Sequence, residues 1–246
     1  MIAKVGKDDN GKIFKRKLFE DNINVDYVFE DENELTGTAL IMVNKQGDNS
    51  IIVVPGANNN MEKQEIEKAM KAIEASDILI AQFETSEDIT LDAFKEAKKL
   101  GKLTVLNPAP AKRIDEELLK VTDIIIPNET EAEILTGIKI ENIEGAEEAA
   151  QVFLTKGVKC VIITLGSKGA AIITKEFSMV VEAFKVKAID TTAAGDSFIG
   201  ALCSKLDFNN LNKENLVDSV IFANKVSSIA VQRKGAQPSI PYLSEI

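Results

Sequence analysis

From about residue 62 onward, hydrophobic positions along the chain follow two alternating patterns. Ile66, Ala69, Met70 and Ile73 recur at the spacing of one helix face, and a short apolar run follows at residues 78–81. Further helical patterns cover residues 91–100 and 146–156, and apolar strands are expected at residues 103–106, 123–126 and 160–165. This alternation is typical of βα units. It predicts an α/β fold, a three-layer αβα sandwich with a mostly parallel central sheet.

The segment before residue 62 has a different pattern. Residues 37–44 and 50–54 are typical of β strands, and the polar stretch 45–49 between them fits a hairpin turn. We therefore predict a small β lid over about residues 15–55 and an α/β core over about residues 61–246.

Polar segments follow four of the predicted strands, at residues 82–85, 107–110, 127–131 and 165–169. In open α/β sheets, ligands bind beyond the carboxyl ends of the strands. The sequence therefore predicts one ligand crevice, lined by these four segments.

The stretch from Asp190 to Ala201 combines small residues with one carboxylate, Asp196, at the start of an apolar helix. Small side chains leave the first N–H groups of a helix uncovered, which suits a phosphate group. Asp196 could accept the proton of an attacking hydroxyl, so the pattern indicates phosphoryl transfer. The alternative is that Asp196 only caps the helix. The P-loop pattern is not present, so phosphates would be held at this helix start.

Composition limits the chemistry further. The 246 residues include no histidine, which excludes Ser-His-Asp and Cys-His nucleophiles and imidazole metal ligands. The net charge is −10 with both signs mixed along the chain, so we expect no nucleic-acid partner. We see no signal peptide and no apolar run of the roughly 20 residues that span a membrane. Cys160 and Cys203 lie in apolar patterns, as expected for core residues of a cytoplasmic protein.

Four stretches together resemble the ribokinase and phosphofructokinase-B family of sugar kinases. These stretches are residues 127–133, 164–169, 190–196 and 233–239. Within the family, the last stretch and residues 106–110 are most similar to ribokinases. The resemblance spans nearly the whole chain, 1–246. It implies a cytoplasmic enzyme that uses ATP to phosphorylate D-ribose at O5, giving ribose 5-phosphate and ADP.

The resemblance also implies roles for individual residues. Asp196 would be the catalytic base, and the N–H groups of Ala194, Gly195 and Asp196 would form the anion hole. Glu84 and Asp196 would contact the sugar, together with lid residues such as Ala39 and Ile41. The ATP-binding residues would be Asn128 near the phosphates, Asn224 near the adenine, and Thr164, Leu165, Gly166, Ser167, Lys168, Gly169, Gly195 and Asp196.

Two cations are implied as well. Glu131 would hold Mg²⁺ through water, which suits an ion that usually keeps several waters. A K⁺ ion would be bound by the side chains of Asp190 and Ser239 and the carbonyls of Thr192, Ala230, Arg233 and Gly235. The alternatives are that Glu131 belongs to the acidic first turn of a helix, and that residues 233–239 form a tight turn.

The chain also departs from the family pattern at its start. The family's first central strand, the first strand of its lid and its Gly-Gly-Lys-Gly-Ala-Asn segment have no counterpart here, so we expect a nearly complete nucleotide half and an incomplete sugar half. Two other functions therefore stay open: a related furanose or deoxyribose kinase, and a non-catalytic nucleotide-binding fragment. A homodimer through the β lid is expected if the N-terminus is complete.

Overall fold

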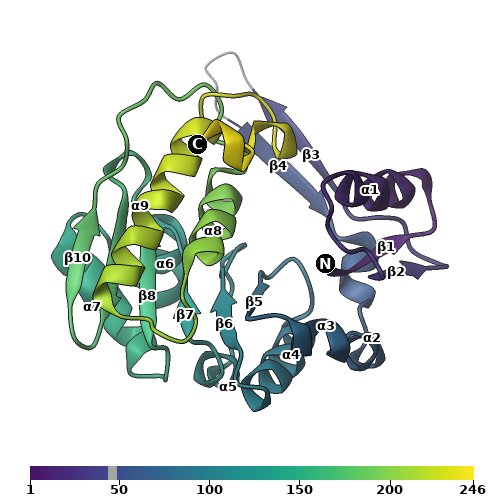
Figure 1. Cartoon of the computed structure of the whole chain (residues 1–246), viewed down its shortest axis with the longest axis horizontal. Coiled ribbons are helices and arrows are strands. Elements are labelled where there is room, and N and C mark those ends of the chain that lie inside the picture. Colours follow the sequence, from purple (N-terminus) through teal and green to yellow (C-terminus); the bar gives the residue numbers. More distant parts are fainter. Residues whose placement is uncertain (44–48) are drawn as a thin grey trace. The chain divides into compact units, whose positions relative to one another are not determined.

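A computed structural model describes residues 1–43 and 49–246 of the chain (Figure 1). The chain divides into two compact units. The first comprises residues 1–76 and 82–100, and the second comprises residues 77–81 and 101–246. Each unit is described by itself below. In the described part of the chain, no helix combines the length and the apolar character needed to cross a membrane.

The second unit is built on a six-stranded sheet with the order β10-β9-β8-β7-β6-β5. Its first four strands in the sequence pair in parallel, and β9 and β10 add antiparallel pairs at one side. The strands are β5 (Ile78–Ala81), β6 (Leu103–Leu106), β7 (Ile124–Ile125), β8 (Cys160–Thr164), β9 (Ala170–Thr174) and β10 (Ser178–Val181). The predicted mostly parallel sheet is confirmed.

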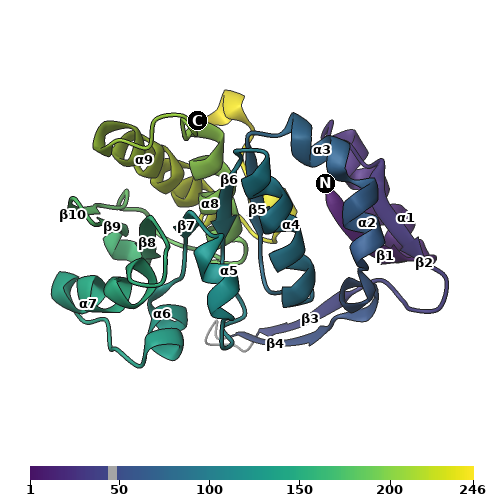
Figure 2. The same cartoon turned by 90° about the horizontal axis from the view of Figure 1, so that it is seen from below.

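Helices cover both faces of this sheet. Figure 2 shows α8 (Ala194–Lys205) and α9 (Lys213–Ala230) along one side of the strands, and α6 (Glu129–Thr136) and α7 (Ile143–Leu154) along the other. On the α8 and α9 side, fully buried residues such as Ile162, Ile172 and Leu202 pack in one core cluster. A short helix, α5 (Glu116–Lys120), precedes β7. The three-layer αβα sandwich expected from the sequence is therefore present.

The first unit contains two small sheets. Strand β1 (Ile2–Gly6) pairs in parallel with β2 (Tyr27–Asp31), and α1 (Asp9–Glu20) connects them. Val5, Leu18 and Val28 form a small core between these elements. The remaining elements are the strands β3 (Thr38–Val43) and β4 (Asn49–Val54), the 3₁₀ helix η1 (Gly56–Asn60), and the helices α2 (Lys63–Lys68), α3 (Met70–Ala75) and α4 (Glu87–Lys99).

The antiparallel pair β3 and β4 lies where the sequence predicts the two strands of a lid. Leu40, Met42 and Ile52 are each more than half exposed on it. Most of the predicted turn, residues 45–48, and the side chain of Ile41 lie outside the described residues. The preceding stretch, which we expected to belong to the lid, forms the end of α1 and then β2, and β2 pairs with β1.

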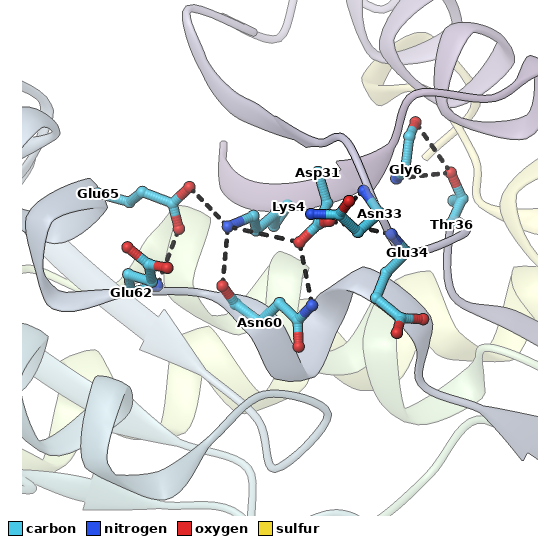
Figure 3. A network of polar contacts seen from close by, with 9 residues as sticks. All are labelled: Lys4, Gly6, Asp31, Asn33, Glu34, Thr36, Asn60, Glu62 and Glu65. Carbon is cyan, nitrogen blue, oxygen red and sulfur yellow. Dashed lines mark hydrogen bonds and ion pairs between the residues drawn. The ribbon is translucent and has the colours of Figure 1, made fainter.

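A buried ion-pair network joins β1, β2 and α2 in the first unit (Figure 3). The Lys4 ammonium lies 3.0 Å from a carboxylate oxygen of Glu65 and 3.7 Å from one of Asp31, and it donates to the carbonyl of Asn60 at 2.8 Å. The side chains of Lys4, Asp31 and Glu65 are each about a tenth exposed. Burying these charges is tolerable because each has several hydrogen-bonding partners.

Candidate active site

A cavity of about 260 Å³ lies in the second unit, beyond the carboxyl ends of β7 and β8. It contains seven residues that the sequence predicted for the site: Asn128, Thr164, Gly166, Gly169, Ala194, Gly195 and Asn224. Glu129 and Thr130 also line it; they belong to the segment 127–131 that was predicted to line the crevice, without a role of their own. Phe198 and Ser227 line it without having been predicted as site residues. Leu165, Ser167, Lys168 and Asp196 are predicted ATP-binding residues that do not line it.

The start of α8 forms one wall of the cavity. Ala193, just before the helix, has a left-handed backbone with φ of 59°, and among the described residues no side chain caps the helix. The N–H of Ala194 donates to the carbonyl of Thr191 at 3.2 Å, so it is already engaged. Around Gly195, an added Cβ would meet open space. This leaves a helix N-terminus, with its partial positive charge, accessible to an anion.

Asp196 occupies the first turn of α8 and is exposed. Its neighbour Ser197 is buried, and the Ser197 hydroxyl donates to the carbonyl of Ala194 at 2.9 Å. The carboxylate of Asp196 therefore lies one residue after Gly195, beside the uncapped helix start.

The turn between β8 and β9 forms the second wall. It contains the 3₁₀ turn η2 (Gly166–Lys168), and Gly166 and Gly169 both have positive φ, of 53° and 108°. The turn is closed by a hydrogen bond from the N–H of Leu165 to the carbonyl of Gly169 at 2.8 Å. Leu165 is buried, whereas Ser167 and Lys168 are exposed. The two glycines line the cavity, and the two residues between them do not.

The start of α6 forms the third wall. The Asn128 side chain accepts from the N–H of Glu131 at 2.8 Å, and the Glu131 carboxylate accepts from the N–H of Asn128 at 2.9 Å. This capping box uses one carboxylate oxygen of Glu131, and burial raises the pKa of Glu131. Glu129, one residue after the cap, lines the cavity and lies 3.7 Å from the Lys168 ammonium.

Helix α9 supplies the last wall through Asn224 and Ser227. The Asn224 amide donates to the carbonyls of Val181 at 3.2 Å and Glu182 at 3.1 Å. Since Asn224 is buried, these two bonds fix its orientation at the end of β10. The predicted position near a nucleotide base stays a prediction.

The residues predicted for K⁺ lie together at the C-terminal end of α9. Asp190 accepts from the Thr192 hydroxyl at 2.6 Å and the Thr192 N–H at 2.9 Å, and its other oxygen accepts from the N–H of Gly235 at 2.9 Å. These bonds lower the pKa of Asp190 to about 2. Ser239, in η3 (Gln237–Ser239), is fully buried and donates to the carbonyl of Ala236 at 2.7 Å. The Ala230 carbonyl accepts from the N–H of Arg233 at 3.0 Å. The hydrogen bond between Gly235 and Asp190 joins the segment 230–239 to the segment 190–192.

Glu84, predicted to contact the sugar, lies in the first unit between β5 and α4 and is exposed. Asp196 lies in the second unit. The contact of both carboxylates with one sugar stays a prediction.

Comparisons with known proteins identify the class to which this fold and site belong. The chain matches the family model described as pfkB family carbohydrate kinase over residues 1–243. The chain belongs to the pfkB family of carbohydrate kinases.

Within this family, the chain is similar to individual kinases of ribose and deoxyribose. The chain is 45% identical over 245 residues to the ribokinase of Staphylococcus aureus (strain COL). This match covers 100% of this chain and 80% of that protein. The chain is 33% identical over 246 residues to the deoxyribokinase of Salmonella typhi, covering 100% of this chain and 79% of that one. The structure of Arabidopsis thaliana ribokinase complexed with ribose and ATP is similar with a TM-score of 0.87 at 33% identity, over 98% of this chain and 78% of that one.

Proposed function

We propose that this chain transfers the γ-phosphoryl group of ATP to O5 of D-ribose, giving ribose 5-phosphate and ADP. The observation that carries the proposal is the start of α8, where an uncapped helix N-terminus lines a cavity and is followed at once by a carboxylate, Asp196. The identity of 45% to a ribokinase over the whole chain supports ribose as the acceptor.

In this proposal, Asp196 accepts the proton of the attacking O5 hydroxyl. The N–H groups at the start of α8, chiefly those of Gly195 and Asp196, stabilise the negative charge that develops on the transferring phosphoryl group. Phosphoryl transfer has a loose transition state, so most of the rate enhancement comes from positioning and from these fixed donors. The base contributes proton removal.

ATP would lie in the cavity between η2 and α9. Its phosphates would reach Gly195 and Asn128, its base would lie near Asn224, and the glycines of the β8 to β9 turn would allow close backbone approach. The exposed Lys168 ammonium lies 3.7 Å from the Glu129 carboxylate. It would approach the nucleotide from the rim of the cavity.

The proposal includes Mg²⁺ with the nucleotide. In the described part of the chain, no three acidic or cysteine side chains gather into a metal site. The ion would therefore be held mainly by the phosphates and water, which suits Mg²⁺, and Glu131 would act through one of those waters with the carboxylate oxygen not needed for its cap.

K⁺ activation is also proposed. The side-chain oxygens of Asp190 and Ser239 and the carbonyl oxygens of Thr192, Ala230, Arg233 and Gly235 are hard ligands of the kind that alkali cations accept. Asp190 already accepts three hydrogen bonds. The ion would hold residues 190–193, which lead into the anion hole. We expect ribose-dependent turnover to fall at least severalfold when K⁺ is replaced by Na⁺ at equal ionic strength. Equal rates in the two salts would contradict the cation site.

Two further parts of the proposal concern the whole protein. The exposed apolar side chains of β3 and β4 support a homodimer through this pair of strands.

A cytoplasmic location is supported by the need for ATP and by Cys160 and Cys203, which are free and shielded by burial.

The substrate test compares acceptors in one assay. ADP formation is measured with ATP, Mg²⁺ and K⁺ and either D-ribose, 2-deoxyribose or fructose. ³¹P NMR then shows which oxygen of the sugar carries the phosphoryl group. Ribose as the best acceptor, phosphorylated at O5, supports the proposal. A preference for 2-deoxyribose would favour the second candidate, for which the 33% identity to a deoxyribokinase is the specific observation. ATP binding without turnover on any sugar would favour a non-catalytic nucleotide-binding protein.

A further inference from the structure

Helix α9 contributes a side chain to the cavity that none of the sequence motifs contains. Ser227 lines the cavity, and its hydroxyl donates to the carbonyl oxygen of Ala194 at 3.1 Å. The same carbonyl oxygen accepts a second hydroxyl hydrogen bond, from Ser197 at 2.9 Å. Two hydroxyl groups from two different helices therefore hold one carbonyl group.

This carbonyl determines where an anion-hole donor points. The carbonyl of Ala194 and the N–H of Gly195 belong to the same peptide group, which is planar and trans, so the two bonds point in opposite directions. Fixing the carbonyl therefore fixes the direction of the Gly195 N–H. Gly195 lines the cavity, and its N–H belongs to the uncapped start of α8.

The backbone just before this peptide group is strained. Ala193 has a left-handed conformation, which is strained for a non-glycine residue. Such a conformation persists only where surrounding contacts determine it. Ser197 belongs to α8 itself, so it moves with the helix. Ser227 contacts this peptide group from outside α8.

The end of α9 anchors the other end of the same loop. The carbonyl of Val231 accepts from the N–H groups of Ile189 at 2.7 Å and Asp190 at 3.2 Å. The loop between β10 and α8 is therefore tied to α9 just before the small-residue stretch and, through Ser227, just after it.

We propose that Ser227 is a positioning residue for phosphoryl transfer. Its hydroxyl holds the peptide group between Ala194 and Gly195 so that the Gly195 N–H faces the transferring phosphoryl group. This inference rests on the proposed function. It predicts that Ser227 acts mainly on the transition state, because the ground-state phosphates have other partners in the cavity whereas the developing charge needs this donor in a fixed direction.

The chain offers a matched control in the next residue. Ser228 is also on α9 and is buried, but its hydroxyl donates to the carbonyl of Lys225 at 2.7 Å, within its own helix, and it does not line the cavity. Ser227→Ala and Ser228→Ala remove the same atom from the same helix. Alanine is a good helix former, so both variants are expected to fold.

The experiment measures kcat, the KM for ATP and the melting temperature of wild type, Ser227→Ala, Ser227→Thr and Ser228→Ala. The loss of one hydrogen bond predicts about a five- to tenfold fall in kcat for Ser227→Ala, with the KM for ATP and the melting temperature nearly unchanged. Ser227→Thr keeps the hydroxyl and should recover most of the rate, and Ser228→Ala should match wild type. An unchanged kcat in Ser227→Ala, or an equal fall in Ser228→Ala, would overturn the inference.

A binding measurement separates this inference from the proposed function. Calorimetry compares the affinity of wild type and Ser227→Ala for Mg·ADP alone and for Mg·ADP with aluminium fluoride, which mimics the transferring phosphoryl group. We expect the variant to lose about five- to tenfold in affinity only when the fluoride is present. This holds whichever sugar is the acceptor, so absence of ribose-dependent turnover in wild type would refute only the proposed substrate. Equal affinities of both proteins for the fluoride complex would refute the role of Ser227.

Discussion

The candidate site depends mainly on small side chains that leave backbone N–H groups accessible, and it contains few reactive groups. At the start of α8, Ala194 and Gly195 leave the helix N-terminus uncovered, and Asp196 adds the single carboxylate. This part of the site could be predicted because small residues before an acid and an apolar helix form a local pattern. Ser227 could not be predicted in the same way, since its contact with Ala194 joins residues 33 positions apart.

Glu129 and Glu131 occupy different positions at the start of α6. Both acids lie in the first turn of α6, and the sequence favoured Glu131 for the metal. In the structure Glu131 completes a capping box, and Glu129 lines the cavity beside Asn128 and Thr130. Which acid lines the cavity depends on the rotation of the helix about its axis, and a turn with alternating acids does not specify that rotation. The role of Glu131 at Mg²⁺ through water stays a prediction.

The buried network around Lys4 gives a stability prediction at this scale. Lys4→Met leaves the carboxylates of Glu65 and Asp31 without their ammonium partner in a site that is about nine-tenths buried. Removing one partner of a buried ion pair is destabilising, so we expect Lys4→Met to unfold at a clearly lower urea concentration than wild type, as followed by circular dichroism.

Lys7→Met is the matched control, because it removes the same charge from the exposed pair with Glu32, whose side chains are 58% and 67% exposed. Exposed pairs contribute little, so this variant should unfold close to wild type. Equal losses in the two variants would show that the Lys4 network is not the stabilising feature that its burial implies.

At the scale of elements, the alternating pattern predicted the parallel strands closely. Residues 78–81 and 103–106 form β5 and β6 with the expected bounds, because these short apolar runs are bounded by polar and glycine residues. The pattern singled out neither β9 nor β10. β9 is buried in all but its last residue, whereas the first three residues of β10 are only partly buried or exposed. An edge strand buries little, and its hydrophobic pattern is correspondingly weak.

The turn between β8 and β9 provides a prediction about an element. An added Cβ at Gly169 would overlap the carbonyl oxygen of Val181 and the amide of Ala183, so Gly169→Ala must displace the backbone after β10. At Gly166 an added Cβ meets open space, and only the left-handed backbone is strained. We expect a loss of about 2–4 kcal/mol for Gly169→Ala and about 1 kcal/mol for Gly166→Ala in urea unfolding.

Nucleotide affinity should follow the same order, because both glycines line the cavity and displacement of β10 also moves the carbonyls that hold Asn224. Calorimetric titration with Mg·ATP at a temperature where both variants are folded provides the measurement. Similar affinities and stabilities for the two variants would contradict the geometry of this turn.

At the scale of the whole molecule, the oligomeric state is a proposal that β3 and β4 allow to be tested. Leu40 and Ile52 are paired across the two strands, and both are more than half exposed. Lys at either position places a charge on this apolar surface, so Leu40→Lys and Ile52→Lys should be monomers in sedimentation velocity where wild type is a dimer.

Ile134→Lys is the control for this prediction, since Ile134 is an apolar residue on α6 that is also more than half exposed. It should leave the sedimentation of wild type unchanged. A monomeric wild-type protein, or dimers in all three variants, would contradict assembly through β3 and β4.

The most direct test of the whole account is ribose-dependent ADP formation by wild type and Asp196→Asn, with Mg·ATP affinity measured in parallel. Asp207→Asn, an exposed residue beyond the other end of α8, is the control. The account predicts turnover by wild type and Asp207→Asn, and a loss of at least about a hundredfold in Asp196→Asn with ATP affinity nearly unchanged. ATP binding by wild type without ribose-dependent turnover, or an Asp196→Asn variant that keeps most of its rate, would contradict it.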